Sequence, residues 1–301
     1  MTQVGGHGPL RASREARKPR ENGAPRASGT ADVRVDTAGF QFAIFDQGAG
    51  DPLLVIPGLQ GRWEWMQPAL TALSRHYRVI SYSLCGDIGS RMRMDPALGF
   101  DVFVRQVDRV MARAGVERMA ICGVSYGGVI ALRYAALNPE RVTALILANT
   151  PGPGWTPDAT QARYVANPWL TFPAFCVAAT RRLGRELSEG LPDWPSRAGF
   201  ILGQLVNVIT APAIPGLMAR RVRLLQQTTL APDCARIAVP TLVVTGAEHL
   251  DLVVPVSSTR EYLRLIPHAA HVSMDDTGHL GSLTQPERFT GIVKEFLARH
   301  S

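Results

Sequence analysis

Residues 119–128 read MAICGVSYGG, and this stretch decides the fold. An apolar segment of strand-like composition leads into Gly123-Val124-Ser125-Tyr126-Gly127-Gly128, and a helical pattern follows from Val129 to Leu137. A G-x-S-x-G motif between a strand and a helix is typical of a sharp turn that exposes the serine at the helix N-terminus. Glycines flank such a serine because a Cβ at those positions would clash with the neighbouring strand and helix. Ser125 is therefore a candidate nucleophile.

The rest of the chain alternates between short apolar runs and helical patterns. Continuous apolar runs of this kind are typical of strands that are covered on both faces of a parallel sheet. They occur near residues 53–56, 77–80, 119–122, 145–147 and 242–244, with helical patterns over 63–75, 100–114 and 129–137, an alternating strand over 270–274 and a closing helix over 286–298. This alternation predicts an α/β fold with a mostly parallel central sheet and helices on both faces.

Composition divides the chain into three parts. Residues 1–31 are rich in Arg, Gly and Pro and have no aromatic residue, so we expect a disordered basic tail. Residues 32–150 and 232–301 carry the strand and helix alternation and form the expected core. Residues 151–231 hold nine of the 22 prolines and three of the five tryptophans. We expect them to form a helical cap, or lid, with short helical pieces such as 174–182 and 217–226.

The net charge of +7 comes from two segments and not from the whole chain. Residues 151–231 carry eight arginines against four acidic residues, and residues 1–34 also have a net charge of +4. A nucleic-acid-binding protein usually spreads its basic residues over a folded face with interleaved aromatics. We therefore predict no nucleic-acid partner, and no apolar run reaches the length of a membrane span.

The cysteines and histidines exclude several kinds of site. The four cysteines are widely spaced without a C-x-x-C pair, and no H-E-x-x-H motif is present. This pattern favours free thiols in a reducing, cytoplasmic compartment and argues against a structural zinc site. We predict no metal site and no cofactor.

A serine nucleophile needs a histidine base and a carboxylate that orients the histidine. His279 follows the predicted strand 270–274 and lies on a loop. Its rivals are weaker: His7 and His300 fall in the termini, His76 precedes an early strand, and His268 and His271 lie at or within the last strand. With a nucleophile elbow the chain order is serine, acid, histidine. The acid should follow strand 242–244, where both Asp251 and Glu248 are candidates; we favour Asp251 and keep Glu248 as the alternative.

The negative charge that develops on the attacked carbonyl oxygen needs two N–H donors. One is the backbone N–H of Tyr126, the residue after the nucleophile. The other should come from the loop Pro57-Gly58-Leu59-Gln60-Gly61, and we predict the N–H of Leu59.

Together these motifs make the chain resemble an α/β-hydrolase-fold serine hydrolase over residues 32–301. The resemblance rests on the elbow at Ser125, on Asp251 with Val254-Pro255, on Gly278-His279 and on the closing helix from Pro286. Two stretches depart from the family's usual pattern. Pro57-Gly58 stands where the family usually has His-Gly, and Ser83-Leu84-Cys85-Gly86 stands where it often has Asp-x-Arg-Gly.

The resemblance implies an esterase that forms an acyl-enzyme with a small-molecule ester. Trp63, Trp155, Trp169 and Trp194 are candidates for a largely apolar substrate pocket, although such aromatics can equally be the core of the cap. Lactone hydrolysis, C–C bond hydrolysis and acyl transfer with the same residues remain alternatives, as does a non-catalytic ligand-binding member of the fold. The sequence gives no indication of the oligomeric state.

Overall fold

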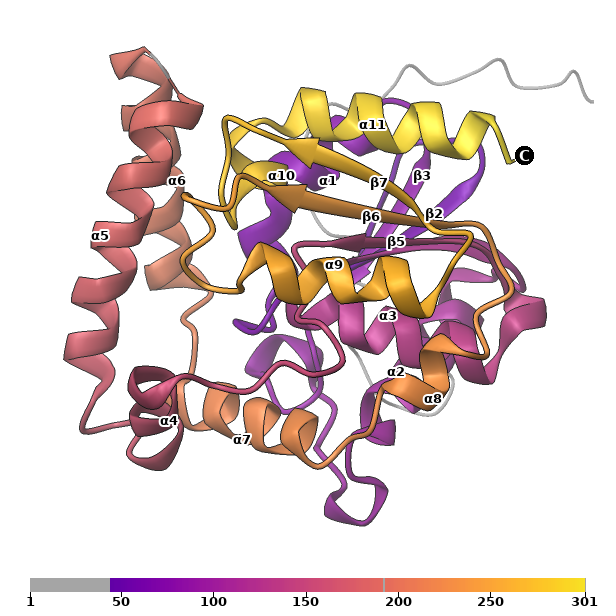
Figure 1. Ribbon diagram of the computed structural model, residues 1–301, viewed down its shortest axis with the longest axis horizontal. Helices are drawn as coiled ribbons and strands as arrows, with labels where there is room; N and C mark the ends of the chain where they lie inside the picture. Colours follow the sequence, from indigo (N-terminus) through magenta and orange to yellow (C-terminus); the bar gives the residue numbers. More distant parts are fainter. Residues whose placement is uncertain (1–43, 192, 301) are drawn as a thin grey trace, which may run out of the picture. The chain divides into compact units, whose positions relative to one another are not determined.

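The computed structural model describes residues 44–191 and 193–300, and its centre is one β-sheet (Figure 1). The described strands are β1 (Ile44–Gln47), β2 (Pro52–Ile56), β3 (Arg78–Tyr82), β4 (Met119–Val124), β5 (Val142–Ala148), β6 (Thr241–Gly246) and β7 (Ala270–Met274). They are ordered β1-β3-β2-β4-β5-β6-β7. Only β1 is antiparallel to its neighbour, with Ile44 opposite Tyr82. The expected mostly parallel sheet is confirmed.

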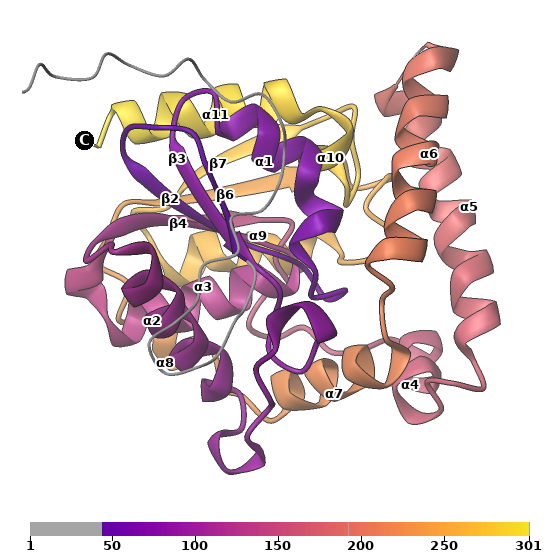
Figure 2. The same cartoon turned by 180° about the vertical axis from the view of Figure 1, so that it is seen from behind.

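Helices cover both faces of the sheet, as Figures 1 and 2 show from opposite sides. On one face lie α1 (Gln67–Leu73), α10 (Gly281–Thr284) and α11 (Pro286–Ala298); on the other lie α2 (Asp101–Ala114), α3 (Tyr126–Leu137), α8 (Ala231–Cys234) and α9 (Val256–Leu265). Because successive side chains of a strand point to opposite faces, each strand contributes to two apolar clusters. In β2, for example, Leu54 and Ile56 join the α2–α3 side, whereas Leu53 and Val55 join the α1–α11 side.

Between β5 and β6, residues 151–231 form a segment that we call the insertion. Four helices precede α8 in it: α4 (Ala159–Ala166), α5 (Phe172–Gly190), α6 (Trp194–Thr210) and α7 (Pro215–Gln226). In Figure 1 the arrowheads of β6 and β7 point toward α5 and α6, so this helix pair stands at the carboxyl-end edge of the sheet. Ligands of open α/β sheets bind at that edge.

Short 3₁₀ turns complete the described chain, at Trp63–Met66, Ile88–Ser90, Pro96–Leu98 and Pro139–Arg141. The predicted strand 270–274 and the closing helix 286–298 match β7 and α11 in both bounds. The predicted basic tail, and the first residues of the predicted core, lie outside the described residues. Within the described part, no single helix is long and apolar enough to cross a membrane; α6 and α7 together meet the test of length and composition but are bent by 94°.

Candidate active site

Ser125 sits on a strained turn between β4 and α3. Its backbone has φ 53° and ψ −124°, a conformation that L-residues rarely adopt. A Cβ at Gly123 would lie 2.3 Å from the carbonyl oxygen of Gly127, and a Cβ at Gly127 would lie 2.2 Å from that of Ile56. The two glycines therefore allow strand, turn and helix to approach one another, which explains the G-x-S-x-G spacing.

His279 lies within hydrogen-bond distance of this serine. Its Nε2 atom is 2.9 Å from Ser125 Oγ, although the two residues are 154 positions apart in the chain. The approach is possible because β4 and β7 are parallel and end at the same edge of the sheet, so that the loops after them meet.

Asp251 completes a chain of three side chains. Its two carboxylate oxygens each lie 3.1 Å from Nδ1 of His279. Oδ1 also accepts hydrogen bonds from the backbone amides of Val253 and Val254, at 3.1 and 3.0 Å. Asp251 is buried, whereas Glu248, the alternative acid, is exposed and makes no described contact with His279.

The ionisation of the pair follows from these contacts. Burial alone would lower the pKa of His279, but the Asp251 carboxylate outweighs burial, and the pKa lies above its ordinary value. Burial alone would raise the pKa of Asp251, but His279 and the two amides outweigh it, and that pKa lies below its ordinary value. Asp251 is therefore an ionised partner for an imidazole that gains a proton.

Glu186, on α5 of the insertion, binds the loop that carries His279. Its Oε1 atom accepts hydrogen bonds from the backbone amides of Gly278 and Leu280, at 2.9 and 2.7 Å. Its side chain is buried, and burial raises its pKa above the ordinary value, partly offset by these two amides. Sequence reasoning missed Glu186, because a lone acidic residue among the arginines of the insertion resembles a solvated charge.

Asn149, directly after β5, connects the acid to the same loop. Its Nδ2 group donates to Asp251 Oδ2 at 3.2 Å and to the carbonyl of Gly278 at 2.7 Å. Like Ser125, it has a positive φ, of 48°. The sequence analysis did not include Asn149 among the site residues, although its position after a parallel strand was a signal.

The loop 57–61 lies beside the serine. A Cβ at Gly58 would be 3.4 Å from Ser125 Cβ. The carbonyl of Gly58 accepts from the amide of Gly61 at 2.9 Å. Within the described part of the chain, the backbone N–H groups of Leu59 and Tyr126 donate no hydrogen bond to another protein group.

Arg221, on α7, fixes this loop from the insertion. Its side chain is fully buried and forms an ion pair with the equally buried Asp87. Its Nη1 group donates to the carbonyl of Leu59 at 2.9 Å, and its own carbonyl accepts from the hydroxyl of Tyr126 at 3.0 Å. Arg221 thus contacts both residues that are predicted to supply the oxyanion donors. It bonds the carbonyl of Leu59 and the hydroxyl of Tyr126, and it leaves their backbone N–H groups unoccupied.

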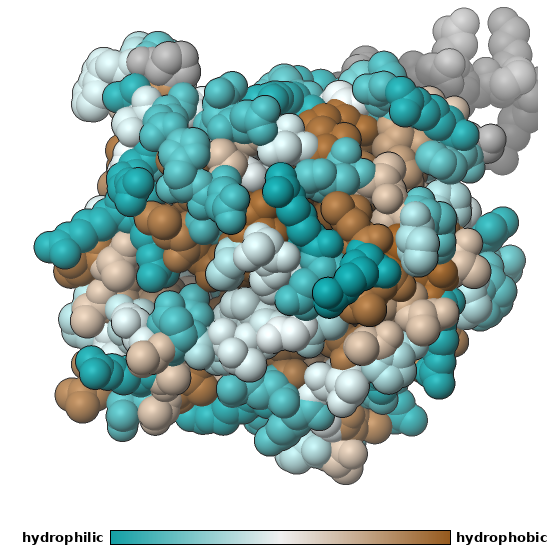
Figure 3. Space-filling model, in the orientation of Figure 1, coloured by the Kyte–Doolittle hydropathy of each residue, from teal (hydrophilic) through white to brown (hydrophobic). Residues whose placement is uncertain are grey.

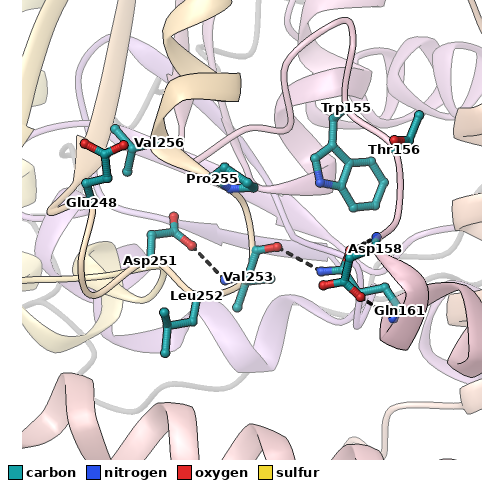
Figure 4. A pocket seen from close by; sticks show the side chains of 10 residues that line it. All are labelled: Trp155, Thr156, Asp158, Gln161, Glu248, Asp251, Leu252, Val253, Pro255 and Val256. Carbon is teal, nitrogen blue, oxygen red and sulfur yellow. Dashed lines mark hydrogen bonds between the residues drawn. The ribbon is translucent and has the colours of Figure 1, made fainter.

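A cavity of about 220 Å³ opens beside Asp251 (Figure 4). Its lining includes Trp155, Asp158, Gln161, Glu248, Leu252, Val253, Pro255 and Val256. Gln161 donates to the carbonyl of Val253 at 3.0 Å. Of the four tryptophans predicted for a pocket, Trp155 lines this cavity.

The other three tryptophans lie elsewhere. Trp63 packs against Phe45, with ring centroids 5.4 Å apart. Trp169 and Trp194 are 67% and 75% exposed. Among the residues that the structure describes, no group of three or more His, Cys, Asp or Glu side chains is arranged to hold a metal ion.

The fold and this site define the class of protein. Residues 51–172 match the model of the α/β hydrolase fold family. The seven-stranded sheet with its flanking helices agrees with that match. The chain therefore has the α/β-hydrolase fold.

Individual relatives are distant but similar along most of their length. The chain is 26% identical over 269 residues to a protein of Klebsiella pneumoniae named as carbamate hydrolase RutD, covering 83% of this chain and 92% of the relative. Its fold is similar to the crystal structure of the enol-lactonase from Burkholderia xenovorans, with a TM-score of 0.70, 22% identity, and coverage of 86% and 96%. A thermophilic esterase from Thermogutta terrifontis is similar at a TM-score of 0.70 and 23% identity, with coverage of 91% and 100%.

Proposed function

We propose that this chain is a serine hydrolase that cleaves carboxylic esters of small, largely apolar substrates. One observation carries the proposal: Ser125, His279 and Asp251 form a continuous chain of hydrogen bonds at the carboxyl-end edge of the sheet. A nucleophile, a base and an orienting carboxylate in this geometry are the parts that acyl transfer requires.

In this mechanism, Ser125 Oγ attacks the ester carbonyl while His279 Nε2 accepts the hydroxyl proton. The carboxylate of Asp251 stabilises the imidazolium that forms. His279 then gives the proton to the departing alcohol, which leaves an acyl group on Ser125. Water attacks this acyl-enzyme, again with His279 as base, and releases the carboxylic acid and the free serine.

The N–H groups of Tyr126 and Leu59 are the donors that we propose for the oxyanion. A trans peptide points its C=O and its following N–H in opposite directions. Because the carbonyl of Gly58 is held by Gly61, the N–H of Leu59 is turned away from that bond and is available to a ligand. One such donor contributes about 10²–10³ to kcat.

The insertion is the proposed cap over this site. Its residues Glu186 and Arg221 contact the His279 loop and the Leu59 loop respectively, which supports a position above the reacting atoms. A cap that excludes water would strengthen the oxyanion interactions, because hydrogen bonds are stronger in a lower dielectric.

Carbamates are the second candidate substrate class. Carbamates carry a carbonyl that the same serine can attack. In addition, the relative from Klebsiella pneumoniae, whose match covers 83% of this chain, is named as a carbamate hydrolase. Lactones require no further residue, because they are cyclic esters.

The test uses an activity-based probe and a substrate panel. A fluorophosphonate should label the parent protein at Ser125, and the Ser125→Ala variant should stay unlabelled. p-Nitrophenyl esters of rising chain length, a p-nitrophenyl carbamate and a simple lactone should then be compared by kcat/KM. Absence of labelling in the folded parent protein would favour the non-catalytic, ligand-binding alternative.

A further inference from the structure

Helix α6 turns its apolar side chains outward. Six aliphatic side chains of this one helix are between 41% and 80% exposed: Ile201, Leu202, Leu205, Val206, Val208 and Ile209. Most surface helices of globular proteins show the opposite arrangement, with the apolar face against the core. Isolated exposed apolar residues are ordinary, but a row of six on one helix requires a physical reason.

The periodicity confirms that these residues form one continuous face. At 100° per residue, the six positions fall on one side of the helix, and Trp194 at its N-terminus, 75% exposed, falls on the same side. The opposite side carries Asn207, which is buried, together with the half-buried Phe200 and Gln204. The helix therefore packs on the protein through a partly polar side and leaves its more apolar side uncovered.

The neighbouring helix α5 carries exposed arginines. Figures 1 and 2 show α5 and α6 side by side, and Arg197 of α6 bonds the carbonyl of Ser188 of α5 at 3.0 Å. Arg181 and Arg185 of α5 are exposed, and neither has an ion-pair partner among the described residues. Figure 3 shows the outer side of α5, at the left, as a mixture of brown and teal side chains.

The acidic residues of this helix pair are already bonded within the protein. Glu186 binds two backbone amides, and Glu189 lies 3.1 Å from Nε2 of His249. Asp193 caps α6 by accepting from the amide of Ser196 at 2.8 Å. Arg181 and Arg185 are thus charges of the helix pair that remain available to an external partner, and that partner should be anionic.

Exposed tryptophans lie near both ends of α6. Trp194 begins the helix, and the indole of Trp169, 67% exposed, lies against Gly216 at the start of α7, shortly after α6 ends. Tryptophan is enriched where an apolar layer meets water, because its ring is apolar and its N–H is polar.

We propose that α6 docks flat on an anionic phospholipid surface, with its aliphatic face in the acyl boundary and the α5 arginines on the headgroups. A 17-residue helix is about 25 Å long, and interfacial helices with an apolar face and flanking arginines bind in this orientation. The charges favour a lipid over a second copy of the chain, since pairing through this face would bring the unpaired arginines of both copies together.

The test is co-sedimentation of the full chain with vesicles of phosphatidylcholine containing about 30% phosphatidylglycerol, compared with pure phosphatidylcholine. The parent protein should bind the anionic vesicles preferentially. Leu202→Gln combined with Leu205→Gln should lower the partition coefficient on the order of 10-fold or more, because two leucines that would be buried in the lipid are removed. Neutralising Arg181 and Arg185 to Gln should lower it about 5-fold per arginine, the factor that roughly 1 kcal/mol per basic residue gives.

Each control carries the same number and type of substitutions as the variant that it matches, so the two have the same net charge and the same residues 1–31. The double variant Arg105→Gln and Arg109→Gln removes two exposed arginines from another part of the surface. Ile88→Gln with Leu137→Gln removes two exposed aliphatic residues away from α6. Both controls should sediment like the parent protein. Should the Leu202/Leu205 variant melt early, Ile201→Gln with Ile209→Gln repeats the test at the same face.

Three results would overturn the proposal. The parent protein could fail to sediment with anionic vesicles, or the α6 variants could bind as well as the parent. Light scattering could also show a dimer that Leu202→Gln with Leu205→Gln dissociates, in which case the face is an interface between two copies.

Discussion

Glu186 Oε1 accepts a 2.7 Å hydrogen bond from the backbone amide of Leu280, the residue directly after His279. A helix of the insertion therefore holds the loop that carries the base, and it does so with a carboxylate. The charge on Glu186 also raises the pKa of His279, in addition to the larger contribution of Asp251. A substitution of Glu186 can therefore separate the effect of its hydrogen bonds from the effect of its charge.

Glu186→Gln should move the acid limb of the pH–rate profile to lower pH. Glutamine keeps an Oε1 acceptor for the amides of Gly278 and Leu280 but removes the negative charge. Turnover needs neutral His279, so the rate rises as pH increases through the His279 pKa, which lies above its ordinary value in the parent protein. Without the charge this pKa falls, and the rise in kcat/KM should begin at lower pH.

The matched control is Glu189→Gln on the same helix, since Glu189 is exposed and bonds His249. Its profile should superimpose on that of the parent protein. An unchanged acid limb in Glu186→Gln, with stability intact, would leave Glu186 a purely structural contact.

Ser125→Ala and His279→Ala should each abolish ester turnover. Nucleophile and base act as one unit, so either loss alone should lower kcat by about 10⁴–10⁶. The measurement is p-nitrophenyl acetate hydrolysis beside thermal melting, which checks that both variants fold. Near-parental kcat in either folded variant contradicts the assignment.

Asp251→Asn should cost about 10⁴ in kcat, because an amide leaves the imidazole in the wrong tautomer. Glu248→Gln should have little effect, since Glu248 is exposed and does not reach His279. Steady-state kinetics of the two variants side by side tests the choice of acid. The reverse order of effects would assign the role to Glu248.

Arg221→Met should destabilise the protein by about 3–5 kcal/mol, because it leaves the carboxylate of Asp87 buried without its partner. Urea denaturation followed by circular dichroism measures the change. The double variant Asp87→Leu with Arg221→Met should recover most of this stability, since apolar replacement of a whole buried pair is often tolerated.

Ester turnover of the double variant should stay low. The carbonyl of Leu59 has lost the donor that fixes its loop, whatever the global stability. Full activity in the recovered double variant would mean that the Leu59 loop holds its geometry without Arg221.

Much of the site was predictable because local sequence specifies it. The glycines around Ser125 allow the sharp turn between β4 and α3, and Asp251 and His279 each lie on a loop that follows a predicted strand. Glu186 and Arg221 were not predictable in this way. Each acts on a loop about 90 to 160 positions away, so their partners depend on how the insertion packs.

The insertion was also the part where helix lengths were hardest to predict. Residues 174–182 and 217–226 were expected to be helical, but α5 extends over Phe172–Gly190 and α6 was not anticipated. Proline obscured α6, because Pro195 suggests a break although it lies in the first turn, where proline is tolerated. The apolar pattern of α6 could not reveal an outward face either, since periodicity alone does not say which side meets the protein.

The contacts that Glu186 and Arg221 make with the core have a consequence for how such a chain can diversify. Glu186 and Arg221 flank residues 187–220 in sequence, and each fixes a different loop beside Ser125. The outward side chains between them, those of α6 included, can be exchanged while the contacts of Gly190 and Ala211 with the core remain in place. Replacing the outer face of α6, and not the whole helix, is therefore the route to re-targeting this scaffold without rebuilding its chemistry.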